Sequence, residues 1–304
     1  MDRLLEVITE AFHSQQKAEG INHSDLRLSL KDRKRNLRIV AATMPEYGLG
    51  VRLIPLFSGA QDANFILLFD AENGHLLALV PGGELNVWRT GAPAGVACRY
   101  LARAKGKELG LLGSGRQARG QLLAIRRALP SLHRVRVFSP TEEHRNSFAS
   151  RMSSWLDMDV EPVESARAAV EGADIIDVAT NCRSPVLEPH WVSPGALIIS
   201  MASGQIPVEL VSSSRVIVSW KKEVLEGKPA REPYTTMIAS GTWSADQIAG
   251  ELGDVILEKM AARQDANEVV LFELVGVPLW DAAAASWAYQ WAQEKKVGNI
   301  FSLS

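Results

Sequence analysis

The segment GSGRQA constrains this chain more than any other feature, because it stands between an apolar run and an amphipathic segment. Residues 108–112 have the pattern of a buried strand, and residues 117–129 have that of a helix. In such a unit Gly113 permits a tight turn, Gly115 lets an anionic ligand approach the backbone, and Ala118 lets the helix lie close to the strand. Free N–H groups at the helix start favour an anion. The setting predicts a dinucleotide-binding βαβ unit rather than a plain strand–helix turn.

Short apolar runs alternate with helical segments from residue 108 onward, which indicates a doubly wound parallel sheet. The first hundred residues instead carry strand-like runs and a hairpin signal at Asn73-Gly74, typical of antiparallel pairing. The expected strands are 37–43, 50–57, 65–70, 76–80, 108–112, 135–138, 160–163, 175–180, 196–202 and, as the last one, 216–220. The expected helices are 2–18, 90–104, 117–129, 142–156, 165–171, 250–262 and 278–296.

The composition excludes several classes of protein. A length of 304 residues exceeds the usual size of one hydrophobic core, so two domains are expected. The net charge of −2 provides no basic surface for nucleic acid or an acidic membrane, and no apolar run is long enough to span a bilayer. The first residues lack the pattern of a secretory signal. Cys98 and Cys182 are expected to stay reduced, and the six histidines lack zinc-ligand spacing, so we expect a cytoplasmic protein without a metal.

The loop after the second strand of the βαβ unit indicates which dinucleotide is bound. NAD-dependent enzymes usually carry Asp or Glu there, about 20 residues after the glycines, to bind the ribose hydroxyls. Here Ser139 and Thr141 stand in that place, and Arg116 and Arg145 are near enough in sequence to meet a 2′-phosphate. NADP(H) is therefore the expected cofactor. NAD(H) is the alternative, if these are ordinary surface residues and the loop is unselective.

Several stretches along the chain make it similar to a known family. The combination of Arg89-Thr90-Gly91-Ala92 with the GxGxQA turn is not a general property of Rossmann proteins. The other matching positions are 44–45, 48–52, 68–74, 78–79, 173–175, 179–181, 185, 209–210, 251–254, 276 and 281. On these residues the chain resembles the ornithine cyclodeaminase/mu-crystallin family of dehydrogenase-like proteins.

The resemblance implies a fold and an assembly. The expected fold class is α/β, with a Rossmann-type doubly wound parallel sheet plus a mixed α+β substrate and dimerisation domain formed by both chain ends. On this basis the dinucleotide-binding domain is placed at 107–282 and the second domain at 1–106 and 283–304. The small-residue helix at 90–104 should pack closely on another segment or another subunit, and a homodimer is expected.

The resemblance also implies how the ligands are held. The family acts on small 2-amino or 2-imino acids, and three basic side chains of its pattern hold the carboxylate, which correspond here to Arg27, Arg52 and Arg89. A guanidinium grips a carboxylate with two parallel N–H bonds. For Arg27 a solvated surface charge is the alternative. The expected cofactor-binding residues are Thr90, Gly113, Ser114, Gly115, Arg116, Gln117, Ala118, Ser139, Thr141, Arg145, Thr180, Asn181, Met201 and Ala202.

Two departures from the family pattern bear on catalysis. The family usually has lysine at the position of Arg52, and arginine cannot pass a proton as lysine can. Ser203 stands where the cyclodeaminases and alanine dehydrogenases carry an aspartate, and the mu-crystallin branch, linked to ketimine reduction, also has serine there. Both positions are candidates for a role in catalysis. The carboxylate that would activate water on an imine, or take a proton from an amine, is missing.

The resemblance, taken with these departures, implies an NAD(P)H-dependent reductase of a C=N bond beside a carboxylate. Candidate substrates are cyclic ketimines such as pyrroline-2-carboxylate or piperideine-2-carboxylate, an acyclic imine, or, given the extra arginine at position 52, a dicarboxylic imine. The alternatives are a cyclodeaminase or amino-acid dehydrogenase of the same family, and a non-catalytic binding protein like the mu-crystallins. The missing aspartate disfavours the cyclodeaminase.

Overall fold

The computed structural model describes residues 1–304 except 24, 32–34, 58–62, 104–105 and 302–304. The chain forms two compact units, of which the parallel-sheet unit comprises Met1–Leu5 and Thr90–Gly276 and the antiparallel-sheet unit comprises Glu6–Arg89 and Val277–Ser304. The expected boundaries were 106/107 and 282/283. The chain instead passes between the units three times, at Leu5/Glu6 and Arg89/Thr90, both inside helices, and at Gly276/Val277. Among the described residues, no helix is both long and apolar enough to cross a bilayer.

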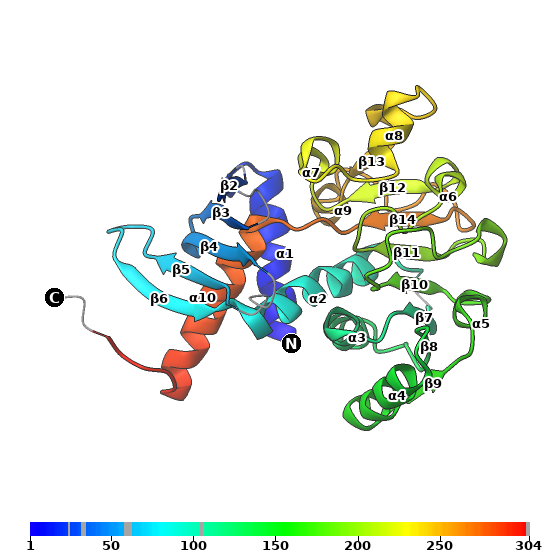
Figure 1. Cartoon of the computed structure of the whole chain (residues 1–304), viewed down its shortest axis with the longest axis horizontal. Coiled ribbons are helices and arrows are strands. Elements are labelled where there is room, and N and C mark those ends of the chain that lie inside the picture. The colour runs from blue at the N-terminus through cyan, green and yellow to red at the C-terminus, as the bar shows by residue number, and fades with distance from the viewer. Residues whose placement is uncertain (24, 32–34, 58–62, 104–105, 302–304) are drawn as a thin grey trace. The chain divides into compact units, whose positions relative to one another are not determined.

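The antiparallel-sheet unit is built on one sheet of sequential hairpins (Figure 1). Gly74 adopts φ +73° in the turn between the last two strands, which confirms the predicted hairpin and shows why glycine stands there. The strands run in the order β1-β3-β4-β5-β6, with β2 also paired to β3. Their bounds are β1 Ile21–Asn22, β2 Leu26–Ser29, β3 Asn36–Met44, β4 Gly48–Leu56, β5 Phe65–Phe69 and β6 Leu76–Pro81.

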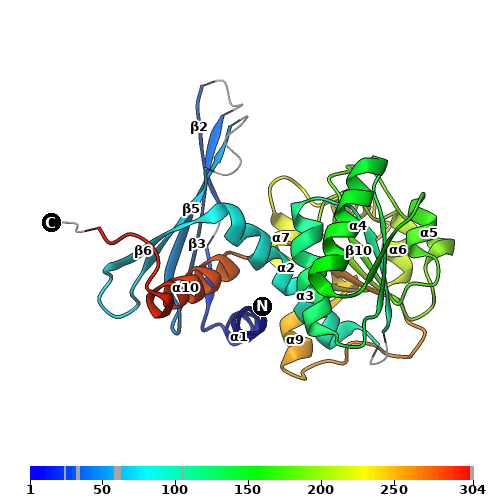
Figure 2. The ribbon, with the colours of Figure 1, turned by 90° about the horizontal axis from the view of Figure 1, so that it is seen from below.

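The two faces of this sheet differ in what covers them. Helix α10 (Pro278–Lys295) lies along one face (Figure 2). Gly50 allows this close approach, because a Cβ there would come within 2.6 Å of the Cβ of Ala282. Helix α1 (Asp2–Gln16) contributes Phe12, whose ring meets Trp280 of α10 edge-on at 5.4 Å. Along β3, β4 and β5, every second side chain points away from α10 and forms the opposite face of the sheet. That face is apolar and partly exposed within this unit.

The parallel-sheet unit confirms the predicted doubly wound architecture. Its strand order is β13-β12-β14-β11-β10-β7-β8-β9, and every pair is parallel. The strands are β7 Glu108–Leu112, β8 Arg134–Phe138, β9 Asp159–Pro162, β10 Ile175–Val178, β11 Leu197–Ser200, β12 Arg215–Val218, β13 Ile248–Glu251 and β14 Val270–Glu273. The helices are α2 Gly82–Leu101, which begins in the other unit, α3 Arg116–Ala128, α4 Glu142–Leu156, α5 Ala166–Val170, α6 Val208–Ser213, α7 Lys221–Glu226, α8 Tyr234–Ala239 and α9 Leu252–Ile256, with 3-10 turns at Pro189–Trp191 and Ala245–Gln247.

The structure corrects three expectations about elements. The last expected strand, 216–220, is followed by β13 and β14, and β14 occupies the middle of the sheet between β11 and β12. The segment expected as helix over 250–262 is helical only in α9. The small-residue helix starts at Gly82 rather than 90, and its later part packs on α3 of the same chain. A Cβ at Gly91 would lie 2.4 Å from the backbone of Gly120, so only glycine permits that contact.

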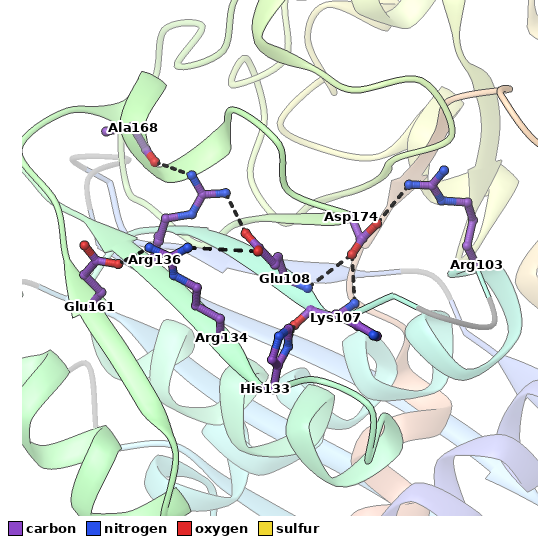
Figure 3. A network of polar contacts seen from close by, with 9 residues as sticks. All are labelled: Arg103, Lys107, Glu108, His133, Arg134, Arg136, Glu161, Ala168 and Asp174. Atoms are coloured by element: carbon purple, nitrogen blue, oxygen red, sulfur yellow. Dashed lines mark hydrogen bonds and ion pairs between the residues drawn. The ribbon is translucent and has the colours of Figure 1, made fainter.

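A network of charges ties the amino ends of the parallel strands together (Figure 3). Asp174, just before β10, accepts backbone N–H bonds from Lys107 at 2.8 Å and Glu108 at 3.2 Å, and a side-chain bond from Arg103 at 2.8 Å. Glu108 in turn pairs with Arg136 of β8 at 3.2 Å. The network therefore fixes β7, β8 and β10 at the edge opposite the glycine turn, which leaves their carboxyl ends to carry a ligand site.

Candidate functional site

The glycine turn lies at the carboxyl ends of the central strands, where open α/β sheets bind ligands. Gly113 follows β7 with φ +125°, a conformation that side chains disfavour. A Cβ on it would lie 2.3 Å from the Ala179 carbonyl oxygen, after β10. Its N–H donates to the carbonyl of Phe138 at 2.8 Å, so the turn is tied to β8. Gly113 is thus required by the protein's own backbone.

Gly115 differs from Gly113, because no atom of the described residues occupies the space beside it. It has φ −88° and ψ −173°, which any residue can adopt, and a Cβ there would meet no atom within 4 Å. It is also the N-cap of α3, and no side chain caps the helix. Ala118 is fully buried, which lets α3 lie against the sheet. The exposed cradle and uncapped helix start fit the pyrophosphate of a dinucleotide.

The loop after β8 holds the residues expected to select the cofactor. Ser139 is buried, and its hydroxyl lies 2.9 Å from the Ser114 hydroxyl and 3.4 Å from the Thr141 carbonyl oxygen. Arg145 on α4 donates to the carbonyl of Ser139 at 3.4 Å, and Arg116 is exposed at the start of α3. No acidic side chain stands between residues 139 and 141. The structure therefore places this set beside the glycine turn.

The loops after β10 and β11 complete this edge of the sheet. Gln205 donates to the carbonyl of Thr180 at 2.7 Å, which fixes the loop that contains the exposed Asn181. Gln121 of α3 contacts the sulfur of Met201 at 3.2 Å, so the loop of Met201 and Ala202 is held against the helix. The expected cofactor residues Thr180, Asn181, Met201 and Ala202 thus lie at the carboxyl ends of β10 and β11. Thr90, Ser114 and Gln117 belong to the same unit, with Thr90 buried in α2 next to its contact with α3.

Ser203 has a structural use of its hydroxyl. Its oxygen accepts the N–H of Glu232 at 2.7 Å and donates to the Ala230 carbonyl at 3.4 Å. The hydroxyl therefore joins the loop 230–232 to the segment that follows β11. No histidine or lysine contacts it among the described residues, so nothing here would activate it as a base.

The loop 230–232 also contributes to a buried ion pair that the sequence did not predict. Arg231 pairs with Glu273 at the end of β14 and also donates to the carbonyl oxygens of Ser200 and Met201 at 3.3 and 3.2 Å. It therefore sets the course of the backbone after β11. One sequence feature could have revealed the acid of this pair. An apolar run ends in Glu273, a pattern that indicates a central strand with an acid at its carboxyl end.

Asp177 is a second buried acid that the sequence did not single out. It lies within β10 and is fully buried, and neither carboxyl oxygen has a hydrogen-bond partner among the described residues. Burial raises its pKa to about 8. Because it lies in the body of the sheet and not at its carboxyl edge, we do not assign it to the ligand site.

The antiparallel-sheet unit brings two of the three expected substrate arginines together. Arg52 of β4 donates to Asp281 Oδ1 at 3.0 Å, and Arg89 places its Nε 3.0 Å from the same oxygen. Arg52 also donates twice to Asn64 Oδ1, at 3.2 and 2.9 Å. We call Arg52 and Arg89 the inner arginine pair. Asp281, on α10, was noted only as a family position, and Asn64 was missed.

The inner arginine pair carries an excess of positive charge in a buried place. Its side chains are 4% and 12% exposed, and they share one carboxylate. Arg89 contacts Asp281 as an ion pair, but its Nε–H does not meet hydrogen-bond geometry, so that donor is unsatisfied. Burial lowers the pKa of Arg89 to about 10, Asp281 opposes this shift, and Arg52 and Arg38 add to it. Arg89 is still charged at neutral pH, so the arrangement is that of an anion site.

Arg27 lies elsewhere on the sheet. It is on β2, its side chain is 34% exposed, and it pairs with Asp25 at 3.3 Å. Arg38, directly opposite on β3, pairs with the same oxygen of Asp25 at 2.7 Å. We call Arg27 and Arg38 the outer arginine pair. The structure therefore divides the three expected arginines between two clusters, and Arg38 is a basic residue that the sequence analysis missed.

The fold defines a class of protein, that of dinucleotide-binding, dehydrogenase-like chains. In this chain two buried arginines share one carboxylate oxygen. The model of the ornithine cyclodeaminase/mu-crystallin family matches residues 1–296. The chain belongs to this family, as its motifs indicated.

Curated relatives are similar to this chain in sequence, and solved structures are similar to it in fold. A Δ1-pyrroline-2-carboxylate reductase of Bacillus cereus is 31% identical over 83% of this chain and 79% of its own length. The structure of the same kind of reductase from Thermococcus litoralis, in complex with NADH and L-proline, has a TM-score of 0.90 at 28% identity and covers 99% of this chain and 96% of its own. An iminosuccinate reductase of Paracoccus denitrificans in complex with NAD+ has a TM-score of 0.87 at 25% identity and covers 97% and 93%.

Proposed function

We propose that the protein is an NAD(P)H-dependent reductase that converts the C=N bond of a small 2-imino acid into the amine of an amino acid. The observation that carries the proposal is the inner arginine pair, two buried guanidinium groups that share one carboxylate oxygen. Such a site suits the carboxylate that adjoins the reacting carbon. The reductases among the relatives act on imines of this kind, and two of the similar structures hold NADH or NAD+.

In this proposal the parallel-sheet unit binds the dinucleotide and the antiparallel-sheet unit binds the substrate carboxylate. The turn at Gly113 and Gly115 and the start of α3 would hold the dinucleotide, which supplies the hydride when bound. Arg89 would bind the substrate carboxylate with its unsatisfied donors, while Asp281 and Asn64 hold Arg52 in place. Arginine, unlike lysine, does not serve as a general acid, so Arg52 would bind and orient only. An imine that arrives protonated needs no acid from the protein, which accommodates the missing aspartate at position 203.

The direct test follows the oxidation of NADPH or NADH with Δ1-pyrroline-2-carboxylate and with acyclic imines formed from 2-oxo acids and ammonia or methylamine. Stoichiometric loss of the reduced cofactor with formation of the amino acid is expected. A parallel incubation with ornithine and catalytic NAD+ is assayed for proline and ammonia. Efficient turnover of ornithine would instead assign the chain to the cyclodeaminases, and tight imine binding without turnover would make it a binding protein.

We infer a preference for NADPH over NADH. Its support is the absence of an acid between residues 139 and 141 and the position of Arg145 against the Ser139 carbonyl. The expected result is a higher kcat/KM with NADPH. Ser139→Asp should shift the ratio towards NADH, because a carboxylate repels a 2′-phosphate and accepts hydrogen bonds from ribose hydroxyls. A wild-type enzyme that prefers NADH, with a ratio insensitive to Ser139→Asp, would contradict this inference.

We also infer a homodimer, formed through the face of the antiparallel sheet that points away from α10. This face is apolar across all its strands and includes Leu26 at 54%, Leu49 at 37% and Leu79 at 57% exposure. Contiguous apolar faces of this kind mark interaction surfaces. A second copy of the chain suits it, because a two-fold axis pairs a patch with itself.

A further inference from the structure

Three of the four arginines in the two pairs lie on one face of the antiparallel sheet, and the fourth, Arg89 of α2, shares the Asp281 oxygen with Arg52. Arg27 is directly opposite Arg38, and Val40, two residues further along β3, is directly opposite Arg52. Cross-strand partners share a face of the sheet, as do residues two apart on one strand. The inner and outer arginine pairs therefore occupy neighbouring positions on one surface. Their separation along the strand is about 7 Å, from the rise per residue.

The two pairs have the same construction. In each of them two guanidinium groups share a single carboxylate oxygen, Asp281 Oδ1 in the inner pair and Asp25 Oδ2 in the outer pair. Arg38 binds Asp25 through its Nε alone. Its terminal nitrogens, on a side chain 31% exposed, make no hydrogen bond to another described residue.

The charges of the two pairs act on each other. Arg38 is among the groups that lower the pKa of Arg89, together with Arg52, so the repulsion between the pairs reaches the buried site. One substrate carboxylate would compensate the inner arginine pair. Arg38 would remain as a positive charge about 7 Å further along the strand, and a second anionic group there would relieve the remaining repulsion.

We propose that the preferred substrate is a 2-imino dicarboxylate, whose first carboxylate binds the inner arginine pair and whose second carboxylate binds Arg38. This assignment rests on the proposed function and deepens it. The sequence suggested a dicarboxylic imine because of Arg52. The structure gives the second charge to Arg38 instead, since Arg52 is held by Asp281 and Asn64.

The reaction balances as an ordinary imine reduction. A hydride from a reduced nicotinamide dinucleotide adds to the imine carbon, the π electrons of the C=N bond pass to nitrogen, and nitrogen takes a proton if the imine has not arrived protonated. The product is a 2-amino dicarboxylate. The substrate must come from a step that condenses a 2-oxo dicarboxylate with ammonia or an amine and loses water, or from one that oxidises an amino dicarboxylate.

The experiment compares pairs of 2-oxo acids that differ only in the distal carboxylate, with ammonium and reduced cofactor. The pairs are oxaloacetate with 2-oxobutanoate, and 2-oxoglutarate with 2-oxopentanoate, and runs without ammonium correct for ketone reduction. The wild-type kcat/KM should be at least tenfold higher for one dicarboxylate than for its matched monocarboxylate. Arg38→Gln should reduce that ratio by about tenfold or more, and Arg38→Lys should restore part of it. Arg151→Gln, an exposed change on α4, serves as the control.

Each result decides the proposal. Equal use of both members of each pair, or an Arg38→Gln variant that loses activity equally on both, overturns it. If no imine is reduced at all, the proposed function fails, and the subsite is tested by binding alone. In that case succinate should raise the Tm of the wild type more than butanoate does, and Arg38→Gln should abolish the difference. No difference in the wild type overturns the subsite as well.

Discussion

Arg89 shows how a single side chain can combine burial, charge and an unsatisfied donor. Its guanidinium is 12% exposed and meets one carboxylate oxygen shared with Arg52. Its terminal nitrogens make no hydrogen bond to another described residue. A buried donor without a partner costs free energy, so such a residue is stable only if a ligand satisfies it or the surroundings hold it. Under the proposed function the first of these alternatives applies, and the ligand is the substrate carboxylate.

We predict that Arg89→Lys lowers kcat/KM for the imino acid about tenfold or more. Lysine keeps the charge but loses the planar fork, and one charge-assisted hydrogen bond contributes roughly 1.5–3 kcal/mol. Steady-state kinetics measure the effect, and circular dichroism checks that the variant is folded. Unchanged kinetics would show that the carboxylate binds elsewhere.

The two glycines of the turn make separable predictions. Gly115→Ala should leave Tm unchanged and weaken dinucleotide binding at least tenfold, because its Cβ enters only the space of the ligand. Gly113→Ala should lower Tm by several degrees, because φ +125° and the Ala179 carbonyl both exclude a side chain. Calorimetry and fluorescence titration with NADPH distinguish the two. The same loss of stability in both variants would contradict the interpretation of Gly115.

Features of the candidate site could be predicted from the sequence where the residues involved are close together in the chain, and not where they are far apart. The glycine turn was recognisable because strand, turn and helix are adjacent in the sequence. The pairing of Arg52 with Asp281 joins residues 229 positions apart, and no local pattern encodes it. Arg38 was missed for the same reason, since its place opposite Arg27 depends on strand register.

Strand β14 is an example of an element that hydrophobic periodicity does not identify. Its four residues are fully buried and have no polar alternation, as expected for the centre of a parallel sheet. A run this short is ambiguous between strand and helix interior. The longer strands and helices β3, β4, α4 and α10 were predicted nearly to their ends, because their periodicity extends over many residues.

Asp174 allows a prediction about how the strands are joined. Burial opposes its charge, but N–H bonds from Lys107 and Glu108 and the bond from Arg103 outweigh this and hold the pKa of Asp174 below its usual value. A lowered pKa stabilises the fold above pH of about 4, and this contribution is lost as pH falls through the folded pKa. Asp174→Asn should therefore cost about 1–2 kcal/mol at pH 7, a value reduced by partial exposure.

The measurement is urea unfolding of wild type and Asp174→Asn at pH 7 and at pH 4 or below, where the difference should shrink. Glu161→Gln is the matched control, because Glu161 belongs to the same network but is 43% exposed and pairs only with Arg134 among the described residues. We expect a much smaller loss in that variant. A constant difference between Asp174→Asn and wild type at all pH values would show that the carboxylate charge is not responsible.

For the whole molecule, the apolar face of the antiparallel sheet predicts assembly. Leu79→Glu should convert the inferred dimer to a monomer, because it places a charge on the exposed apolar face. Light scattering after gel filtration measures the mass. Trp155→Glu is the control, since Trp155 is 56% exposed on α4 in the other unit. A wild-type chain that is monomeric at micromolar concentration would contradict the inferred dimer.

The position of β14 in the sheet has a consequence for how the protein is made. Strand β14 lies between β11 and β12, and α10 covers the antiparallel sheet, so both units depend on residues after 269. During synthesis neither core can close until β14 and α10 have emerged from the ribosome. We expect nascent chains that stop before β14 to remain unable to bind a dinucleotide and to need protection from aggregation. In this protein the synthesis of residues 270–295 therefore decides when either unit can finish folding.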